Sequence, residues 1–337
     1  MTQEKERFTA FRRSLLGVTA GVLLGFTTSA SAEDVEMRIG LIYNPNVPAA
    51  KCGAIPMAED PALKDLGIKI NVVHSAQLGG ENDMAQQVSS GELEMSISAS
   101  SILASWLEDL SVFETYYLYD NVDQAFAAYK TDTAKKLFKE LRDVANIQVI
   151  GTPWLYGERH VFGNKPLRKP EDFKGVKMRV PQTSVSIAGA QSLGASPTPT
   201  AYAELYLALQ QGIVDVAEAP ASVVKAESFD EPSKYFNKTG HLISAAPVYL
   251  NGTLWDSLSP EQQQALEKAV DAAAERIRKC VEEADEEAYA SWKQAGTPEI
   301  IEDVDREALK AQSRAFFSQG FPFSESYKAL IEELKQY

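Results

Sequence analysis

Residues 172–181 read Asp-Phe-Lys-Gly-Val-Lys-Met-Arg-Val-Pro, which predicts a turn followed by a short strand. Asp172 can hydrogen-bond to its own backbone, and Gly175 tolerates the positive φ that many turns require. Residues 176–180 alternate between the two faces of a strand, with Val and Met on one face and Lys and Arg on the other. Because Pro181 cannot donate a ladder hydrogen bond, the strand should end there.

Arg179 is the penultimate residue of this predicted strand. Open α/β sheets bind their ligands at the carboxyl ends of strands, so the side chain lies where a ligand is expected. A guanidinium presents two parallel donors that match a planar carboxylate and fix its orientation. We therefore expect Arg179 to bind the carboxylate of a ligand.

Predicted strands and helices alternate through the first third of the chain. The strands are expected at 37–43, 68–73 and 94–98, with helical segments at 49–66 and 81–89 between them. This order favours parallel strands joined by right-handed crossovers, and therefore an α/β fold. Later strands are expected at 147–154, 214–217 and 242–250.

One long helix is predicted at 260–294. Ser259-Pro260-Glu261-Gln262 combines a serine N-cap, a proline at the first helical position and a glutamine at the third, which is a strong helix start. Apolar residues then recur every three or four positions as far as Trp292, and Gly296 ends the helix. This stripe indicates a helix that packs one face against the core.

The first 32 residues have the features of a signal peptide. Basic residues precede an apolar segment, 15–26, that is too short to span a bilayer comfortably, and Ala30-Ser31-Ala32 is an A-x-A cleavage pattern. We expect export with cleavage after Ala32, in preference to a retained membrane anchor. Arg12-Arg13 also resembles a twin-arginine signal, so the export route stays open.

The chain is acidic. Its formal net charge is −14, and because residues 1–32 contribute +2, the remaining 305 residues carry −16. This charge argues against binding to nucleic acid or to anionic membrane surfaces. An anionic ligand would therefore need a local basic cleft.

The chain has two cysteines, Cys52 and Cys280. In an exported protein such a pair can form a disulfide, here across a long loop, or remain as two buried thiols. No C-x-x-C or other metal-binding spacing occurs, and no metal or cofactor is expected.

Several motifs, in order along the chain, resemble those of solute-binding proteins of tripartite ATP-independent periplasmic (TRAP) transporters. They lie at 77–80, 91–95, 172–181, 193–199 and 204–215. The resemblance implies an α/β protein with two lobes, mixed sheets, a ligand cleft between the lobes and a long helix that braces both. The implied organisation is a signal peptide at 1–32, lobe I mostly at 33–153, lobe II mostly at 154–245, and a C-terminal strand and helices at 246–337.

Six further residues are candidates for contact with the ligand: Arg159, Tyr156, Trp154, Ser100, Tyr116 and Glu218. Arg159 matches the position of a second ligand-binding arginine in the family, although it could instead be solvated or pair with Glu158. Ser100 begins a predicted helix whose free backbone N–H groups could face a ligand or simply be capped. The aromatic residues could stack on a ligand or pack in the core or hinge.

The resemblance implies capture of a small organic acid in the periplasm and its delivery, by a monomer, to membrane subunits driven by an ion gradient. Catalysis is not expected, because the three histidines lie in no H-E-x-x-H motif and no G-x-S-x-G or phosphate-binding loop occurs. The alternatives are a periplasmic enzyme that acts on an acidic sugar and a receptor that feeds a sensor kinase. The ligand stays open among four-carbon dicarboxylates, sugar acids, keto acids and amino-acid-like zwitterions.

Overall fold

The computed structural model describes residues 34–337, so the expected signal peptide lies outside the described residues. Nine strands of the described part form one mixed sheet in the order β2-β1-β3-β8-β4-β7-β5-β6, with β9 paired to β8. The strands are β1 (Val35–Gly40), β2 (Ile68–Val73), β3 (Met95–Ile97), β4 (Ile147–Gly163), β5 (Lys177–Val180), β6 (Ser196–Pro199), β7 (Val216–Ala219), β8 (Tyr235–Asn251) and β9 (Glu299–Ile301).

Helices lie between these strands and after them. The α-helices are α1 (Ile55–Ala58), α2 (Pro61–Asp65), α3 (Glu81–Ser90), α4 (Ser100–Leu103), α5 (Val122–Ala128), α6 (Asp132–Ala145), α7 (Ser184–Ser192), α8 (Leu205–Gln210), α9 (Ala221–Ala226), α10 (Gly252–Ser257), α11 (Pro260–Ala295), α12 (Arg306–Phe317) and α13 (Ser324–Leu334). Helical segments of the π or 3-10 type are η1 (Ala49–Ala54), η2 (Glu108–Glu114), η3 (Pro170–Phe173) and η4 (Tyr202–Glu204). The predicted α/β class is confirmed.

The first half of the sheet contains the three early strands. β1 pairs in parallel with both β2 and β3, as the alternation of strands and helices predicts. Met37 and Ile39 of β1 are fully buried, which explains the alternating apolar pattern in this strand. β3 pairs antiparallel with β8, so the sheet as a whole is mixed.

Two strands of 17 residues each, β4 and β8, cross from one half of the sheet to the other. They pair antiparallel along most of their length, and the register shifts at three points. The sequence predicted only one part of each strand, 147–154 and 242–250. The rest was missed because irregularities break the alternation: Gly151 and Gly157 adopt positive φ values of 61° and 125° within β4.

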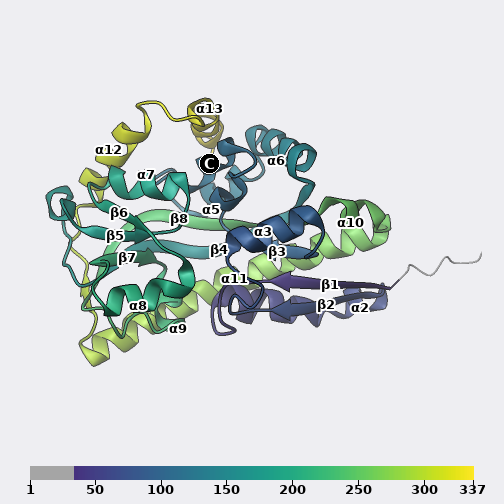
Figure 1. Ribbon diagram of the computed structural model, residues 1–337, viewed down its shortest axis with the longest axis horizontal. Helices are drawn as coiled ribbons and strands as arrows, with labels where there is room; N and C mark the ends of the chain where they lie inside the picture. Colours follow the sequence, from purple (N-terminus) through teal and green to yellow (C-terminus); the bar gives the residue numbers. More distant parts are fainter. Residues whose placement is uncertain (1–33) are drawn as a thin grey trace, which may run out of the picture. The chain divides into compact units, whose positions relative to one another are not determined.

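The second half of the sheet contains β5, β6 and β7. β5 pairs in parallel with β6 and β7, and β7 pairs antiparallel with the end of β4. Figure 1 shows these strands on the left and β1 to β3 on the right, with β4 and β8 passing between them. The sheet runs without interruption through both halves, and the lobe boundaries at 33–153, 154–245 and 246–337 remain predictions.

Helix α11 confirms the predicted long helix and its start. The Ser259 hydroxyl accepts a hydrogen bond from the backbone of Gln262, and the Gln262 side chain accepts one from the backbone of Ser259. Gly296 ends the helix in the left-handed conformation with a φ of 71°. The helix lies against β4, η1 and α9, and Figure 1 shows it running beneath both halves of the sheet.

A disulfide joins Cys52 of η1 to Cys280 of α11, with the two Cα atoms 6.4 Å apart. It ties the first half of the sheet to the long helix across 228 residues of sequence. Among residues 34–337, no helix combines the length and apolar character needed to cross a membrane. The same residues contain no cluster of metal-ligating side chains.

Candidate functional site

A cavity lies where residues from both halves of the sheet meet. Residues that follow β1 and β3 line one side, and residues of β4, β5 and β7 line the other. The enclosed space is about 40 Å³, room for a few water molecules. A wider hollow of about 360 Å³ adjoins it and shares Glu81, Arg179 and Tyr202 as walls. Together they have the concave form typical of small-molecule sites.

Arg179 lies at the end of β5, where Pro181 follows the strand, as the sequence predicts. Its side chain is only 3% exposed and lines the cavity. Nε and Nη2 both donate to the carbonyl oxygen of Thr200, at 3.0 and 2.7 Å. Nη1 has no hydrogen-bond partner among the described residues, so the end of the guanidinium remains available to a carboxylate.

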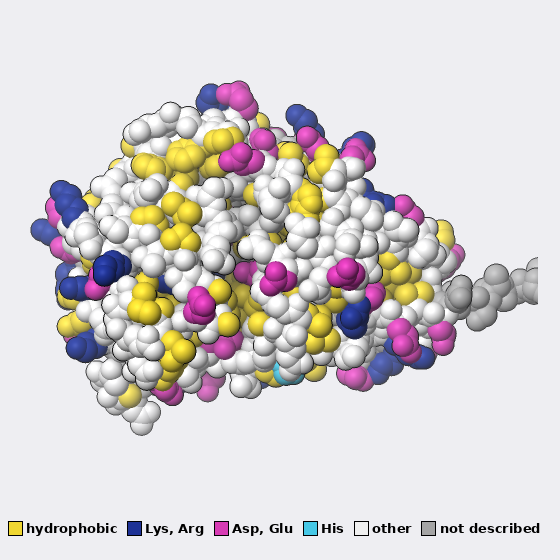
Figure 2. Space-filling view, in the orientation of Figure 1, with side chains coloured by type: hydrophobic (Ala, Val, Ile, Leu, Met, Phe, Trp, Pro, Cys, Tyr) yellow, Lys and Arg dark blue, Asp and Glu magenta, His cyan; other side chains and the backbone are white. Residues whose placement is uncertain are grey.

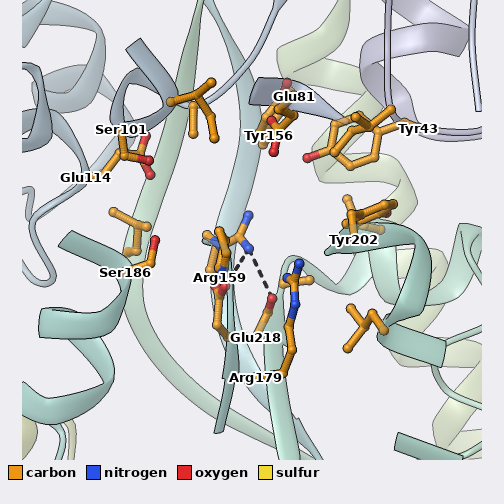
Figure 3. Close-up of a pocket in the computed structure, with 18 of the residues that line it drawn as sticks. Tyr43, Glu81, Ser101, Glu114, Tyr156, Arg159, Arg179, Ser186, Tyr202 and Glu218 are labelled. Carbon is orange, nitrogen blue, oxygen red and sulfur yellow. Dashed lines mark hydrogen bonds and ion pairs between the residues drawn. The ribbon is translucent and has the colours of Figure 1, made fainter. Parts of the chain in front are cut away.

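Arg159 of β4 lies beside Arg179 in the cavity, but it is already paired (Figure 3). Nη2 donates to Oε1 of Glu218 at 2.7 Å and to the Glu218 carbonyl at 3.1 Å, and Nε donates to Oε2. The suggested partner Glu158 is therefore wrong. Adjacent strand residues point to opposite faces, and Glu158 instead contacts His160 and Arg306.

Glu218 lies at the centre of a buried cluster of polar side chains that includes Arg159 and His241. Burial raises the pKa of this carboxyl group, but Arg159 and His241 lower it further, so the net shift is downward and Glu218 is ionised. His241 Nε2 lies 3.6 Å from Glu218 Oε2, and burial lowers the pKa of the imidazole. The Arg159–Glu218 pair is therefore a fixed, electrically balanced part of the cavity wall.

Three tyrosines form an aromatic wall. The ring of Tyr43 stands almost perpendicular to those of Tyr156 and Tyr202, with centroids 5.0 and 5.3 Å away. The hydroxyl groups of Tyr156 and Tyr202 are buried and have no hydrogen-bond partner among the described residues. Unpartnered buried hydroxyls are costly, so a ligand or water should supply partners there. Tyr116 also lines the cavity and packs on His241 at 4.5 Å between centroids.

Two further carboxyl groups face the cavity, from α3 and η2. Glu81 is the first residue of α3, where the Gly79-Gly80 turn leads into the helix. Partial burial raises the pKa of Glu81, and Arg159 and Arg179 oppose that shift. Glu114 is 5% exposed, and burial raises its pKa to about 8. Its Oε1 atom has no hydrogen-bond partner among the described residues.

The positively charged side chains of the site are buried and do not lie on the protein surface. Arg159 and Arg179 have only 13% and 3% of their surface exposed. On the face shown in Figure 2, lysine and arginine side chains stand mostly near the margins, and no broad basic patch is visible. Both arginines are thus buried, and Arg179 is the one whose charge no carboxylate of the described residues neutralises.

The structure brings five of the seven predicted ligand residues to the cavity wall: Arg179, Arg159, Tyr156, Tyr116 and Glu218. Trp154 does not reach it, because the side chain is completely buried in the core and its indole Nε1 donates to the Val270 carbonyl of α11. Ser100 also lies outside it, because its hydroxyl is bonded to Tyr129 at 2.6 Å. Neither residue lines the cavity, so the geometry gives no support to the expected ligand contact of these two residues.

Sequence reasoning missed six polar residues of the wall: Tyr43, Glu81, Ser101, Glu114, Ser186 and Tyr202. Tyr43 follows β1 at the carboxyl end of a parallel strand, where the rule used for Arg179 would have found it. Ser101 directly follows Ser100, the residue that the sequence analysis names as a candidate. Glu114 carried no local signal, because it is the last residue of the helical segment η2 and only tertiary packing brings it to the cavity.

The chain matches the sequence profile of the family described as "Bacterial extracellular solute-binding protein, family 7" over residues 66–322. It is 29% identical to the sialic acid-binding periplasmic protein SiaP of Vibrio cholerae over 253 residues, which cover 74% of this chain and 78% of that protein. It is also 29% identical to the 2,3-diketo-L-gulonate-binding periplasmic protein YiaO of Escherichia coli, with 80% and 82% of the two chains covered.

Solved structures show the same fold. A TRAP periplasmic solute-binding protein of Ochrobacterium anthropi with bound L-fuconate superposes with a TM-score of 0.83 at 31% identity, covering 90% of this chain and 100% of the other. A TRAP protein of Roseobacter denitrificans with bound 3-deoxy-D-manno-oct-2-ulosonic acid gives a TM-score of 0.84 at 25% identity, with 90% and 99% covered. Such neighbours are two-lobed binding proteins, which confirms the predicted fold class.

Proposed function

The chain belongs to family 7 of the bacterial extracellular solute-binding proteins, and from that premise we propose that it captures a small organic acid in the periplasm and delivers it to TRAP membrane subunits. The protein is a binding component without catalytic activity, and it works as a monomer. Arg179 binds the carboxylate of the acid, and the remaining cavity wall recognises the rest of the molecule.

The observation that supports this proposal most is the unused end of the Arg179 guanidinium. The Thr200 carbonyl holds the Nε edge of the group and so fixes its orientation. An arginine that is held in place by a backbone carbonyl loses little further freedom when a carboxylate binds. Hydrogen bonds between charged groups contribute about 1.5 to 3 kcal/mol each, so two of them would supply much of the affinity of a micromolar ligand.

The enclosed form of the cavity favours capture by closure of the two halves of the protein around the acid. Glu81 and Glu114 come from one half, and Arg159 and Arg179 come from the other, so a ligand that touches both sets joins the halves. The ligand can stabilise the closed form only to the extent that it binds that form better than the open one. A shift from 1% to 99% closed requires a preference of about 5.5 kcal/mol.

The comparisons favour binding over catalysis, because the relatives and structural neighbours described above carry names of solute-binding proteins. The lining also fits this reading. His241, which contacts the wall residues Tyr116 and Glu218, bonds through Nδ1 to the Thr239 hydroxyl at 2.8 Å, and its Nε2 faces Glu218. Both nitrogens are thus directed at protein groups, and neither faces a substrate.

A thermal-shift screen over organic acids tests the proposal. An acid present at 100 times its Kd should stabilise the protein by about 2.7 kcal/mol and raise its Tm by several degrees. Mass spectrometry of the incubated acid should then recover it unchanged. A screen in which no carboxylic acid raises the Tm would overturn the proposed function, and conversion of the acid to a product would favour the alternative of a periplasmic enzyme.

A further inference from the structure

The charged side chains of the cavity are not evenly spread. Figure 3 shows the guanidinium groups of Arg159 and Arg179 on the lower side, with Glu218 between them, and the carboxyl groups of Glu81 and Glu114 on the upper side. The cavity thus has a basic end formed by β4, β5 and β7 and an acidic end formed by α3 and η2. A ligand that spans it meets opposite charges at its two ends.

The basic end has room for one carboxylate. Arg159 is bound to Glu218 through Nε and Nη2, so its positive charge is already neutralised within the wall, although its Nη1 has no hydrogen-bond partner among the described residues. Arg179 forms no ion pair among residues 34–337, and Nη1 is its unpartnered atom. A second carboxylate on the ligand would find no second arginine whose charge is uncompensated.

The acidic end lacks cations of its own. Neither Glu81 nor Glu114 takes part in an ion pair with a lysine or an arginine within the described chain. Oε1 of Glu114 is buried without a hydrogen-bond donor, although the backbone of Ser100 contacts the same carboxyl group. A donor on the ligand would satisfy this buried atom, and a cation placed there would also favour the ionised form of Glu114, whose pKa burial raises to about 8.

The aromatic wall stands beside this acidic end. Tyr43 and Tyr156 lie next to Glu81 in Figure 3, and Tyr202 continues the wall toward Arg179. The faces of aromatic rings attract cations, and the attraction grows when the cation is removed from water. Carboxylates together with tyrosine rings are a favourable surrounding for a substituted ammonium or an amidinium group.

We propose that the ligand is a dipolar acid, with its carboxylate on Arg179 and a cationic group that donates hydrogen bonds directed at Glu81, Glu114 and the tyrosines. The proposal rests on the proposed function and narrows its substrate class. A dicarboxylate would place its second negative charge against two carboxyl groups in an enclosed site. A hydroxylated acid could donate hydrogen bonds to the carboxyl groups, but it would bring no positive charge to them.

The test is a thermal-shift and calorimetric panel of acids with matched chain lengths. Each length is represented by an ω-amino acid, an ω-hydroxy acid and a dicarboxylate, for example 4-aminobutanoate, 4-hydroxybutanoate and succinate. Betaines, L-proline, L-galactonate and L-fuconate extend the panel to substituted ammonium groups and sugar acids. The proposal predicts that the largest rise in Tm comes from a zwitterion, with at least tenfold higher affinity than the hydroxy acid of the same length.

The outcomes separate this inference from the proposed function. If a sugar acid, a hydroxy acid or a dicarboxylate gives the largest rise, the inference is wrong and the proposed function stands. If no zwitterion raises the Tm, the inference is likewise overturned, whatever the other acids do. If no acid of any class raises the Tm, both are overturned.

Paired variants identify the acidic end directly. Glu114→Gln and Glu81→Gln keep the shape of each side chain and remove the carboxylate, and each should lower the affinity for the best zwitterion about tenfold or more. The affinity for the matched hydroxy acid should change by less than threefold. Glu92→Gln, at an exposed position outside the cavity, is the matched control and should leave both affinities unchanged. Equal losses for the zwitterion and the hydroxy acid in the two cavity variants would contradict the proposal.

Discussion

Replacing Arg159 with methionine should destabilise the protein by about 3 to 5 kcal/mol, because it leaves a buried carboxylate without its counter-ion. Glu218 is 2% exposed, and it accepts three hydrogen bonds from this one arginine, two at its carboxylate and one at its carbonyl. Methionine fills a similar volume, so the loss would come from the unpaired charge and not from a void. The remaining neighbour, His241, could offset part of the cost only by taking up a proton.

A double-substitution cycle separates the charge from the packing. Glu218→Gln removes the charge that Arg159→Met leaves unpaired, so the double variant should recover most of the lost stability. The assay is urea unfolding at pH 7.5, followed by tryptophan fluorescence, for the wild type, the two single variants and the double variant. Arg168→Met is the matched control, because its partner Asp303 is 72% exposed and the change should cost less than about 1 kcal/mol.

Two results would refute this reasoning. The first is an Arg159→Met variant whose free energy of unfolding lies within about 1 kcal/mol of the wild type, which would mean that the pair contributes no more than a surface ion pair. The second is a double variant that is as unstable as Arg159→Met alone. Either would return Arg159 to the ligand-contacting role that the family resemblance implies.

Three further predictions concern other parts of the structure. Burial raises the pKa of Glu114 from 4.5 to about 8, so the folded state binds this proton more tightly than the unfolded state. The free energy of unfolding should therefore fall by up to about 5 kcal/mol as the pH rises from 4.5 to 8. This pH dependence should disappear in Glu114→Gln, and a variant that keeps it would contradict the prediction. Gly189→Ala should weaken acid binding at least tenfold, since its Cβ would lie 2.5 Å from the Tyr116 ring, and unaltered calorimetric affinity would count against a rigid wall. Replacing Cys52 and Cys280 with serine should lower the free energy of unfolding by about 3 to 5 kcal/mol without altering acid affinity, and a stability equal to that of the wild type would show that the cross-link contributes little.

The sequence was most informative where local rules and tertiary structure agree. The capping box at Ser259 and the apolar stripe after it fixed the long helix almost to the residue. Pro181 correctly ended β5 and so placed Arg179 at a strand end beside the cavity. In both cases one local feature, a cap or a missing N–H group, determines the backbone on its own.

The sequence was less informative where long-range pairing overrides local pattern. β4 and β8 extend well beyond their predicted ranges, because their bulges interrupt the alternation while the ladder between them continues. The Arg159–Glu218 pair could not be predicted, since the two residues are 59 positions apart and meet only through the β4–β7 pairing. Trp154 was misjudged for a related reason: a tryptophan at a strand end can face a ligand or the core, and only the position of α11 decides.

The acidic end of the cavity shows the same limit. Glu81 and Glu114 are ordinary in the sequence of a chain rich in acidic residues, and nothing local distinguishes them from solvated carboxylates. Their significance arises from burial and from the arginines opposite them. The fold and the position of Arg179 could thus be predicted from the sequence, whereas the roles of Glu81 and Glu114 became visible only in the structure.

The most direct test of the central claim is a calorimetric titration of Arg179→Lys with the acid that most strongly stabilises the wild type. Lysine keeps the positive charge but lacks the two parallel N–H donors of the guanidinium. Losing two charge-assisted hydrogen bonds of about 1.5 to 3 kcal/mol each should weaken binding by about 100-fold or more. An affinity within threefold of the wild type, in a variant that unfolds at the same temperature, would show that Arg179 does not hold the acid.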